Sequence, residues 1–160
     1  MHSFPLIFLL GFSLLVFSRS EAQDQVDAGF DLQAHRGGMG LVAEGTLQAF
    51  ANALELGVNT LELDTQLTAD GRVVVTHDRQ VQARNCQDTE PVFAGDPQFP
   101  YVGKYIKDLS LAQVRTLDCG SRQVAGYSEQ RVVPGATMPL LRDVFDLVQL
   151  YRADTVMLNI

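Results

Sequence analysis

The chain has 160 residues, of which 46% are hydrophobic and 19% are charged, and its formal net charge is −7. This composition is typical of a globular protein and excludes the fibrous and intrinsically disordered classes. The negative charge, together with the lack of a Lys/Arg cluster, argues against a nucleic-acid partner, because backbone phosphates are bound by concentrated positive charge.

The N-terminal segment is typical of a secretory signal peptide. Residues 4–17 form an apolar block that is shorter than the roughly 20 residues needed to span a bilayer. Ser20-Glu21-Ala22 then supplies a small-x-small pattern, which predicts cleavage after residue 22. An uncleaved anchor stays open, because residues 1–3 contain no Lys or Arg. We therefore expect a secreted protein, extracellular or periplasmic, in which residues 23–160 form one domain without a further membrane span.

Strand and helix patterns alternate along the rest of the chain. The expected elements are a strand at 31–35, a helix at 46–57, strands at 59–67 and 72–78, a long loop at 80–107, helices at 110–120 and 137–152, and a strand at 155–160. Thr46 and Ser110 are predicted caps, and Gly57 is placed to end the first helix. Such alternation predicts an α/β fold with a parallel sheet, whose ligands bind beyond the carboxyl ends of the strands.

The stretch LELDTQLTADGRVVVTHD, from Leu61 to Asp78, is predicted to form a β-hairpin. Asp70-Gly71 lies between two alternating or β-branched runs, which is a strong hairpin signal. If these two residues alone form the loop, Asp64 lies opposite His77. Glu62, Asp64 and His77 then share one side of the strand pair, with opposed Cβ atoms roughly 5 Å apart.

The expected bonding state of the two cysteines, Cys86 and Cys119, depends on the predicted compartment. In an oxidising compartment an even pair favours a disulfide, and two thiolates are too few for a structural zinc site. Two buried free thiols remain the alternative.

Polar residues gather at the predicted strand ends. His35 and His77 are the only histidines after residue 22, and each ends a strand beside a charged neighbour, Arg36 or Asp78. A histidine at a strand end is more often a surface residue than a catalyst, but two in matching positions favour acid/base chemistry.

The acidic residues have alternative interpretations too. Glu62 and Asp64 form a solvated strand face or, if they point inward, require a cation such as Ca²⁺ or Mg²⁺. Glu44, just before the cap of the first helix, can simply serve the positive end of the helix dipole.

In this order, AHRG, EGTLQAF, LELDTQLTADGRVVVTHD and MPLLRDVFDLV followed by MLNI resemble the glycerophosphodiester phosphodiesterase family, from residue 32 to residue 160. The resemblance implies a (β/α)₈ barrel that hydrolyses small glycerophosphodiesters to glycerol 3-phosphate and an alcohol. The site residues that it implies are His35 and His77 as the general acid/base pair, Arg36 as the phosphate ligand, Glu62 and Asp64 as ligands of Ca²⁺ or Mg²⁺, and Glu44 and Asp78 in support. The loop at 80–107 reads as an insertion.

Two positions depart from the family pattern. Gly45 stands where the family usually has Asn, a change expected to loosen the turn that holds Glu44. The strand at 155–160 stops where the family continues into a glutamate that is a third metal ligand, so about half of a barrel of roughly 250 residues is expected here. We expect a fragment or truncated product that is inactive on its own. The alternatives are a non-catalytic secreted binding module, a degenerate barrel, or a related phospholipase D or phospholipase C barrel.

Overall fold

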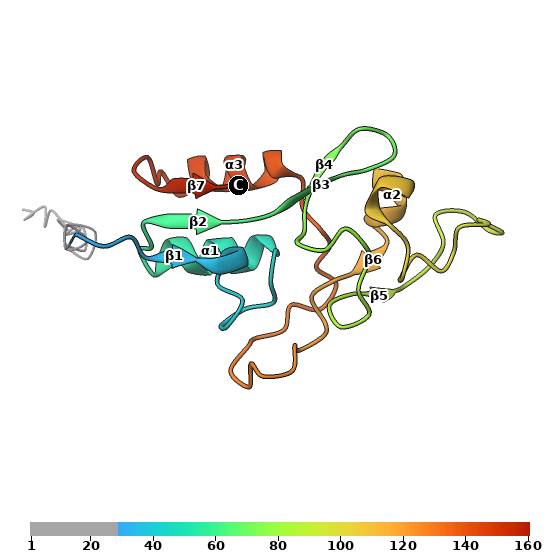
Figure 1. The fold of residues 1–160 in the computed structure, drawn as a ribbon, viewed down its shortest axis with the longest axis horizontal. Helices are drawn as coiled ribbons and strands as arrows, with labels where there is room; N and C mark the ends of the chain where they lie inside the picture. The colour runs from blue at the N-terminus through green and yellow to red at the C-terminus, as the bar shows by residue number, and fades with distance from the viewer. Residues whose placement is uncertain (1–28) are drawn as a thin grey trace, which may run out of the picture.

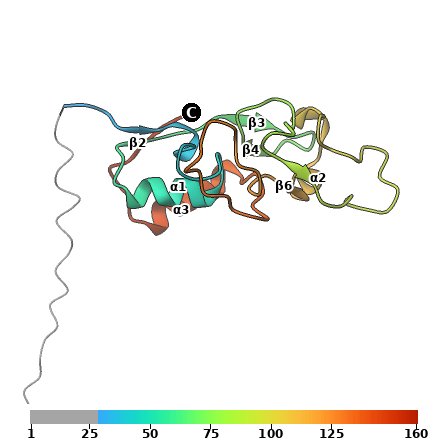
Figure 2. The same cartoon turned by 90° about the horizontal axis from the view of Figure 1, so that it is seen from below.

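A three-stranded parallel sheet forms one half of the molecule. The computed structural model describes residues 29–160, so the predicted signal peptide lies outside the described residues. Strand β2 (Thr60–Glu62) lies between β1 (Gln33–Ala34) and β7 (Met157–Asn159), and both neighbours run parallel to it. Helices α1 (Leu47–Glu55) and α3 (Leu141–Leu150) pack together on one side of this sheet (Figures 1 and 2). The predicted α/β class with a parallel sheet is confirmed.

The core beneath this sheet follows from the apolar spacing of the two helices. Phe50 and Ala53 of α1 and Val144 of α3 are buried against the strand residue Leu61. Positions three apart lie on the same helix face, so Phe50 and Ala53 reach the sheet together. The predicted N-cap of α1 is confirmed, because the Thr46 hydroxyl accepts a hydrogen bond from the Ala49 amide at 3.1 Å.

A second half packs around its own core. It contains the antiparallel strands β3 (Thr65–Leu67) and β4 (Val73–Val75), the antiparallel strands β5 (Gln87–Asp88) and β6 (Leu117–Asp118), a 3₁₀ turn at Ile106–Asp108 and the short helix α2 (Leu111–Val114). Its largest buried side chains are Tyr101, Ile106, Leu109, Val114 and Leu117. This half lies beyond the carboxyl ends of β1 and β2, on the right of Figure 1.

The register predicted for the hairpin is wrong by one residue. Thr65 pairs with Val75, and the Thr68 amide donates to the Arg72 carbonyl at 2.9 Å, so the loop has three residues. A two-residue type I′ loop needs positive φ at both central positions, whereas only Gly71, at φ 72°, is left-handed here. Asp64 therefore faces Thr76, whose amide donates to its carbonyl at 3.0 Å, and not His77.

All the predicted helices and strands are shorter than their sequence patterns, and two of them differ most. The strand expected at 59–67 divides into β2 and β3, which belong to different sheets. The helix expected at 110–120 ends with α2 at Val114, and the chain then enters β6, which pairs with β5 inside the predicted long loop. That pairing takes the place of further helical hydrogen bonds, and it depends on residues about 30 positions away in the sequence.

The long loop between β4 and α2 is braced by a buried polar cluster. Asp96 is only 7% exposed, and its carboxylate accepts hydrogen bonds from the Tyr101 hydroxyl at 2.7 Å and the Gln113 amide at 2.9 Å. Because buried polar groups are stable only when they are paired, this cluster fixes the loop against α2. Among residues 29–160, no helix has the length and apolarity needed to cross a membrane.

Candidate functional site

The first site residue, Arg36, lies in a strained turn at the end of β1. The chain makes a 3₁₀ turn at His35–Gly37, inside which Arg36 has left-handed dihedrals of φ 51° and ψ 38°. The backbone amide of Arg36 donates to Glu62 Oε2 at 2.7 Å. Gly37, at φ 78°, lies so close to the ring of Phe50 that a Cβ atom would be 3.0 Å from it. The His-Arg-Gly sequence thus lets β1 turn sharply over helix α1.

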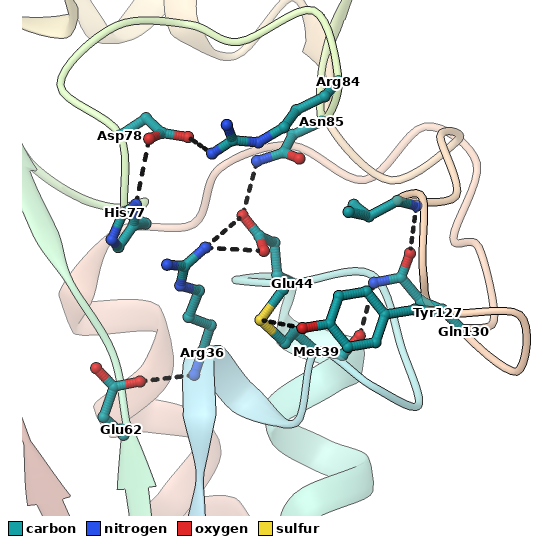
Figure 3. Close-up of polar contacts among 11 residues, drawn as sticks. Arg36, Met39, Glu44, Glu62, His77, Asp78, Arg84, Asn85, Tyr127 and Gln130 are labelled. Carbon is teal, nitrogen blue, oxygen red and sulfur yellow. Dashed lines mark hydrogen bonds and ion pairs between the residues drawn. The ribbon is translucent and has the colours of Figure 1, made fainter.

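A chain of polar contacts runs from Arg36 to the long loop (Figure 3). Arg36 Nη1 lies 3.2 Å from Glu44 Oε2 and 3.5 Å from Glu44 Oε1. Asn85 Nδ2 donates to the same Oε1 atom at 2.7 Å. The side chains of Arg36 and Glu44 are only 17% and 11% exposed, so solvent screens this ion pair weakly. Glu44 therefore links the turn at Arg36 to Asn85, which lies 41 positions after Glu44 in the sequence.

A second chain of contacts involves His77. Its Nδ1 atom lies 3.2 Å from Asp78 Oδ1, and the other carboxylate oxygen of Asp78 accepts a hydrogen bond from Arg84 Nη2. The side chain of His77 is 40% exposed, and the rest of its ring is open to solvent and to the cavity beside it. Figure 3 shows that Arg84 and Asn85 approach the site from the same loop.

These contacts surround a cavity between the two halves of the molecule. It is lined by Arg36, Glu44, Gly45, Thr46, Leu63, Asp64, Val75, Thr76, His77, Asn85, Cys86, Cys119, Thr137 and Met138. Three side-chain atoms of these lining residues, Arg36 Nε, Asp64 Oδ2 and Asn85 Oδ1, are buried without a hydrogen-bond partner among the described residues. Because unpaired buried polar atoms are rare and costly, the cavity is suited to a ligand that offers both acceptors and donors.

The predicted site residues are only partly brought together. Arg36, Glu44, Asp64 and His77 line the cavity, although the hairpin register that led us to expect His77 there is wrong. Glu62 is not a lining residue, but it holds the backbone of Arg36. His35 is exposed and does not line the cavity.

The two cysteines lie at the cavity wall, and their Sγ atoms are 2.11 Å apart, which is a bonding distance. No group of three or more His, Cys, Asp or Glu side chains within residues 29–160 is placed to hold a metal ion. Within the described residues, the predicted metal ligands Glu62 and Asp64 are therefore not part of a cluster of three or more such side chains.

The sequence did not predict the contacts made by two loop segments, one containing Arg84 and Asn85 and the other containing Tyr127 and Gln130. Arg84 and Asn85 belong to the segment predicted only as a long loop, and their position just before Cys86 was the one available signal. Further along the chain, buried Gln130 donates to the Met39 carbonyl at 2.7 Å, and the Tyr127 hydroxyl lies 3.8 Å from the sulfur of Met39 (Figure 3). These contacts fix the turn that leads to Glu44.

Comparison with known proteins assigns the chain to a family. The family model described as "Glycerophosphoryl diester phosphodiesterase family" matches residues 35–160. The chain belongs to this family. A glycerophosphodiester phosphodiesterase of Caldanaerobacter subterraneus is 33% identical over 115 residues, which cover 72% of this chain and 39% of that protein. A human protein named lysophospholipase D is 32% identical over 116 residues, covering 71% of this chain and 31% of its own length.

Solved structures of the family extend the comparison to the fold. A glycerophosphoryl diester phosphodiesterase homologue from Silicibacter pomeroyi superposes with a TM-score of 0.68 at 29% identity, over 80% of this chain and 43% of that one. A phosphodiesterase from Oleispira antarctica, solved with the product sn-glycerol-3-phosphate, gives a TM-score of 0.59 at 25% identity, over 81% and 43%. The α/β unit described above is thus part of the family's (β/α)₈ barrel, and the chain spans less than half the length of these relatives.

Proposed function

We propose that this chain carries the phosphate-binding and proton-transfer side of a secreted, metal-dependent glycerophosphodiester phosphodiesterase, which hydrolyses a glycerophosphodiester to glycerol 3-phosphate and an alcohol. The observation that carries the proposal is the cavity beyond the strand ends, where Arg36, Asp64 and His77 converge within a member of this family. The product bound in the Oleispira antarctica relative supports the substrate class.

Arg36 is the proposed ligand of the phosphate. A phosphodiester is an anion that repels nucleophiles, so its hydrolysis requires positive charge around the phosphorus. The side chain of Arg36 lines the cavity and is only 17% exposed, and its Nε atom, which has no partner among the described residues, is available to donate to a phosphate oxygen. Arg–phosphate hydrogen bonds are charge-assisted and therefore strong.

His77 is the proposed proton acceptor. A carboxylate only accepts hydrogen bonds, so the contact with Asp78 places a proton on Nδ1 and leaves Nε2 free to take a proton from the attacking water. Asp78 is held in turn by Arg84, which orients the imidazole. His35, next to Arg36, is the proposed second partner, which protonates the leaving alkoxide.

Glu62 and Asp64 are the proposed ligands of Ca²⁺ or Mg²⁺. The donor set fits a hard cation, because carboxylate oxygens suit these ions and Asp64 Oδ2 is buried without a hydrogen-bond donor. Bound there, the cation would supply positive charge that neutralises the phosphodiester. Two carboxylates leave the remaining coordination positions to water, substrate or other oxygen groups.

Secretion belongs to the same proposal. The signal peptide predicted at residues 1–22 and the bonding distance between Cys86 and Cys119 both suit an oxidising compartment. We propose that the two cysteines form a disulfide and that the protein acts outside the cytoplasm on glycerophospholipid head groups. A lysophospholipase D activity is the second candidate, and the similarity to the human lysophospholipase D favours it.

An assay of several phosphodiesters tests the proposal. A full-length version of the protein is used, because residues 23–160 alone are expected to be inactive. It is incubated with glycerophosphocholine, glycerophosphoethanolamine and lysophosphatidylcholine, with Ca²⁺ or Mg²⁺, and both glycerol 3-phosphate and lysophosphatidic acid are measured. We expect glycerol 3-phosphate from the first two substrates and no release after chelation. Lysophosphatidic acid as the main product would favour the second candidate, and no product from any substrate would contradict both.

The metal ligands are tested in the same assay. Asp64→Asn removes one ligand charge, so we predict that it raises the Ca²⁺ or Mg²⁺ concentration needed for half-maximal activity by about 10-fold or more. Asp146→Asn, an identical change at an exposed position of α3, is the control and should leave the metal titration unchanged. An unchanged titration for Asp64→Asn would place the cation elsewhere.

A further inference from the structure

The turn formed by residues 82–86 touches both sides of the site. The amides of Asn85 and Cys86 donate to the Gln82 carbonyl at 3.1 and 2.9 Å, and Cys86 Sγ lies at bonding distance from Cys119. From this turn Arg84 reaches Asp78 and Asn85 reaches Glu44. The turn is thus fixed at its base, and its Arg84 and Asn85 side chains contact Asp78 and Glu44, the residues that hold His77 and Arg36 (Figure 3).

The hydrogen bonds from the guanidinium group of Arg36 to described residues are made by one nitrogen, Nη1. Glu44 contacts Nη1, whereas Nε is buried without a partner among the described residues. In a guanidinium group the N–H bonds of Nε and Nη2 are parallel, and together they form the edge that binds two oxygens of a carboxylate or phosphate side-on. The contact with Glu44 therefore leaves this edge without a hydrogen-bond partner among the described residues.

Asn85 determines how Glu44 can approach Arg36. A carboxylate that is free to move beside an arginine tends to form two parallel hydrogen bonds with it. Here Glu44 Oε1 is 2.7 Å from Asn85 Nδ2 but 3.5 Å from Arg36 Nη1, so the amide holds this oxygen and the ion pair rests mainly on Oε2 at 3.2 Å. Without the amide donor, Glu44 is free to turn and compete for the side-on edge of Arg36.

We infer that Asn85 is a positioning residue that holds Glu44 so that the Nε–Nη2 edge of Arg36 stays free to bind an oxyanion. The inference rests on the proposed function for the identity of that oxyanion as the phosphate of the substrate. Asn85 acts through Glu44, and its contribution therefore concerns anion binding rather than proton transfer.

Titration with inorganic phosphate tests this role independently of turnover. The purified protein is titrated in the presence of a chelator, with binding followed by NMR, so that only protein groups contribute. Asn85→Asp keeps the size of the side chain but replaces the donor by an oxygen that repels Glu44. Losing a charge-assisted hydrogen bond predicts phosphate affinity about 10- to 100-fold weaker than in the wild-type protein. Asn52→Asp, which adds the same charge on α1, should change the affinity less than 3-fold.

A second variant covers the case in which Asn85→Asp does not fold. Asn85→Ala removes the donor without adding charge, and it should also weaken phosphate binding by about 10-fold and raise KM for the diester more than it lowers kcat. Wild-type phosphate affinity in either folded variant would overturn the inference. A wild-type protein that binds no phosphate would overturn it as well, whereas phosphate binding that depends on Asn85 without hydrolysis would support it and contradict only the proposed function.

Discussion

Arg36 is the residue whose backbone departs most from ordinary geometry within the site. A left-handed conformation costs a residue with a Cβ atom roughly 1–2 kcal/mol, and here it is held by hydrogen bonds from the Arg36 amide to Glu62 and from the Gly45 amide to the Arg36 carbonyl. Gly45 is itself left-handed, at φ 66°. Asparagine tolerates this conformation better than most residues, which explains why glycine can stand where the family usually has Asn.

At the residue scale we predict that, in a full-length version of the protein, His77→Ala and His35→Ala each lower kcat by about 10²- to 10⁴-fold, as expected for the loss of a general acid or base. Both side chains are exposed, so the thermal unfolding midpoint should change little. Steady-state kinetics with a glycerophosphodiester provide the measurement, and Tyr105→Ala, at an exposed ring outside the cavity, is the control. Near-native turnover in either histidine variant would remove that histidine from the mechanism.

At the scale of the elements, the site depends on the contact between the turn at 82–86 and the residue that follows strand β6. Cys86 ends the turn and Cys119 follows β6, 33 positions later, and both line the cavity. A cross-link between them would restrict the unfolded chain and hold Asn85 and Arg84 at the site in the folded protein.

We predict that replacing both cysteines, Cys86→Ser with Cys119→Ser, lowers the free energy of unfolding by about 3 to 4 kcal/mol. Without the cross-link, the unfolded chain gains conformational entropy worth about that much for a loop of this length. The midpoint of thermal unfolding should fall by roughly 10 °C, measured by circular dichroism. A reducing agent should lower the midpoint of the wild-type protein by a similar amount and leave the double variant unchanged. A wild-type midpoint that does not respond to reductant would mean that the thiols are not cross-linked.

At the scale of the whole molecule, strand β4 connects the two cores. Val74 belongs to the core around Tyr101, and its neighbour Val75 belongs to the core beneath the parallel sheet. Because successive side chains of a strand point to opposite faces, one short strand can serve both cores. The cavity lies where the two halves meet, and loosening either half should therefore disturb it.

Several buried or hydrogen-bonded carboxylates make the stability of the whole molecule sensitive to acid. Hydrogen bonds from Gln113 and Tyr101 lower the pKa of Asp96 below its usual 3.8. The Thr68 hydroxyl and the Leu111 amide lower the pKa of Asp70. Burial raises the pKa of Asp118, but hydrogen bonds from Ser121 and Gly120 outweigh it, so the net change is downward.

A lowered pKa in the folded state means that these groups stabilise the protein above about pH 4 and lose that contribution as the pH falls through their folded-state values. We therefore predict that the unfolding midpoint drops as the pH falls below about 4, which thermal denaturation over a series of acidic pH values would measure. Asp96→Asn should lower the midpoint at pH 7 and flatten its dependence on acid. An equally steep acid dependence in Asp96→Asn would show that Asp96 is not one of the groups responsible.

The sequence by itself determined the features that depend on neighbouring residues. The caps at Thr46 and Ser110, the end of α1 near Gly57 and the apolar stripes of α1 and α3 follow from local hydrogen bonding and helical periodicity. The alternation of strands and helices predicted the parallel sheet, and the His-Arg-Gly, Glu-x-Asp and His-Asp motifs indicated the family.

Only the tertiary structure decided the hairpin register, the short α2 and the contacts of Asn85 with Glu44. Asp70-Gly71 is compatible with both a two-residue and a three-residue loop. The structure has the three-residue loop, in which Asp70 does not adopt the positive φ that a two-residue type I′ loop requires. Glu44 and Asn85 lie 41 residues apart, in segments without a shared periodicity, and no local pattern connects them. Their contact forms because the fold brings the turn at 82–86 over the end of β1, where a buried carboxylate needs donors.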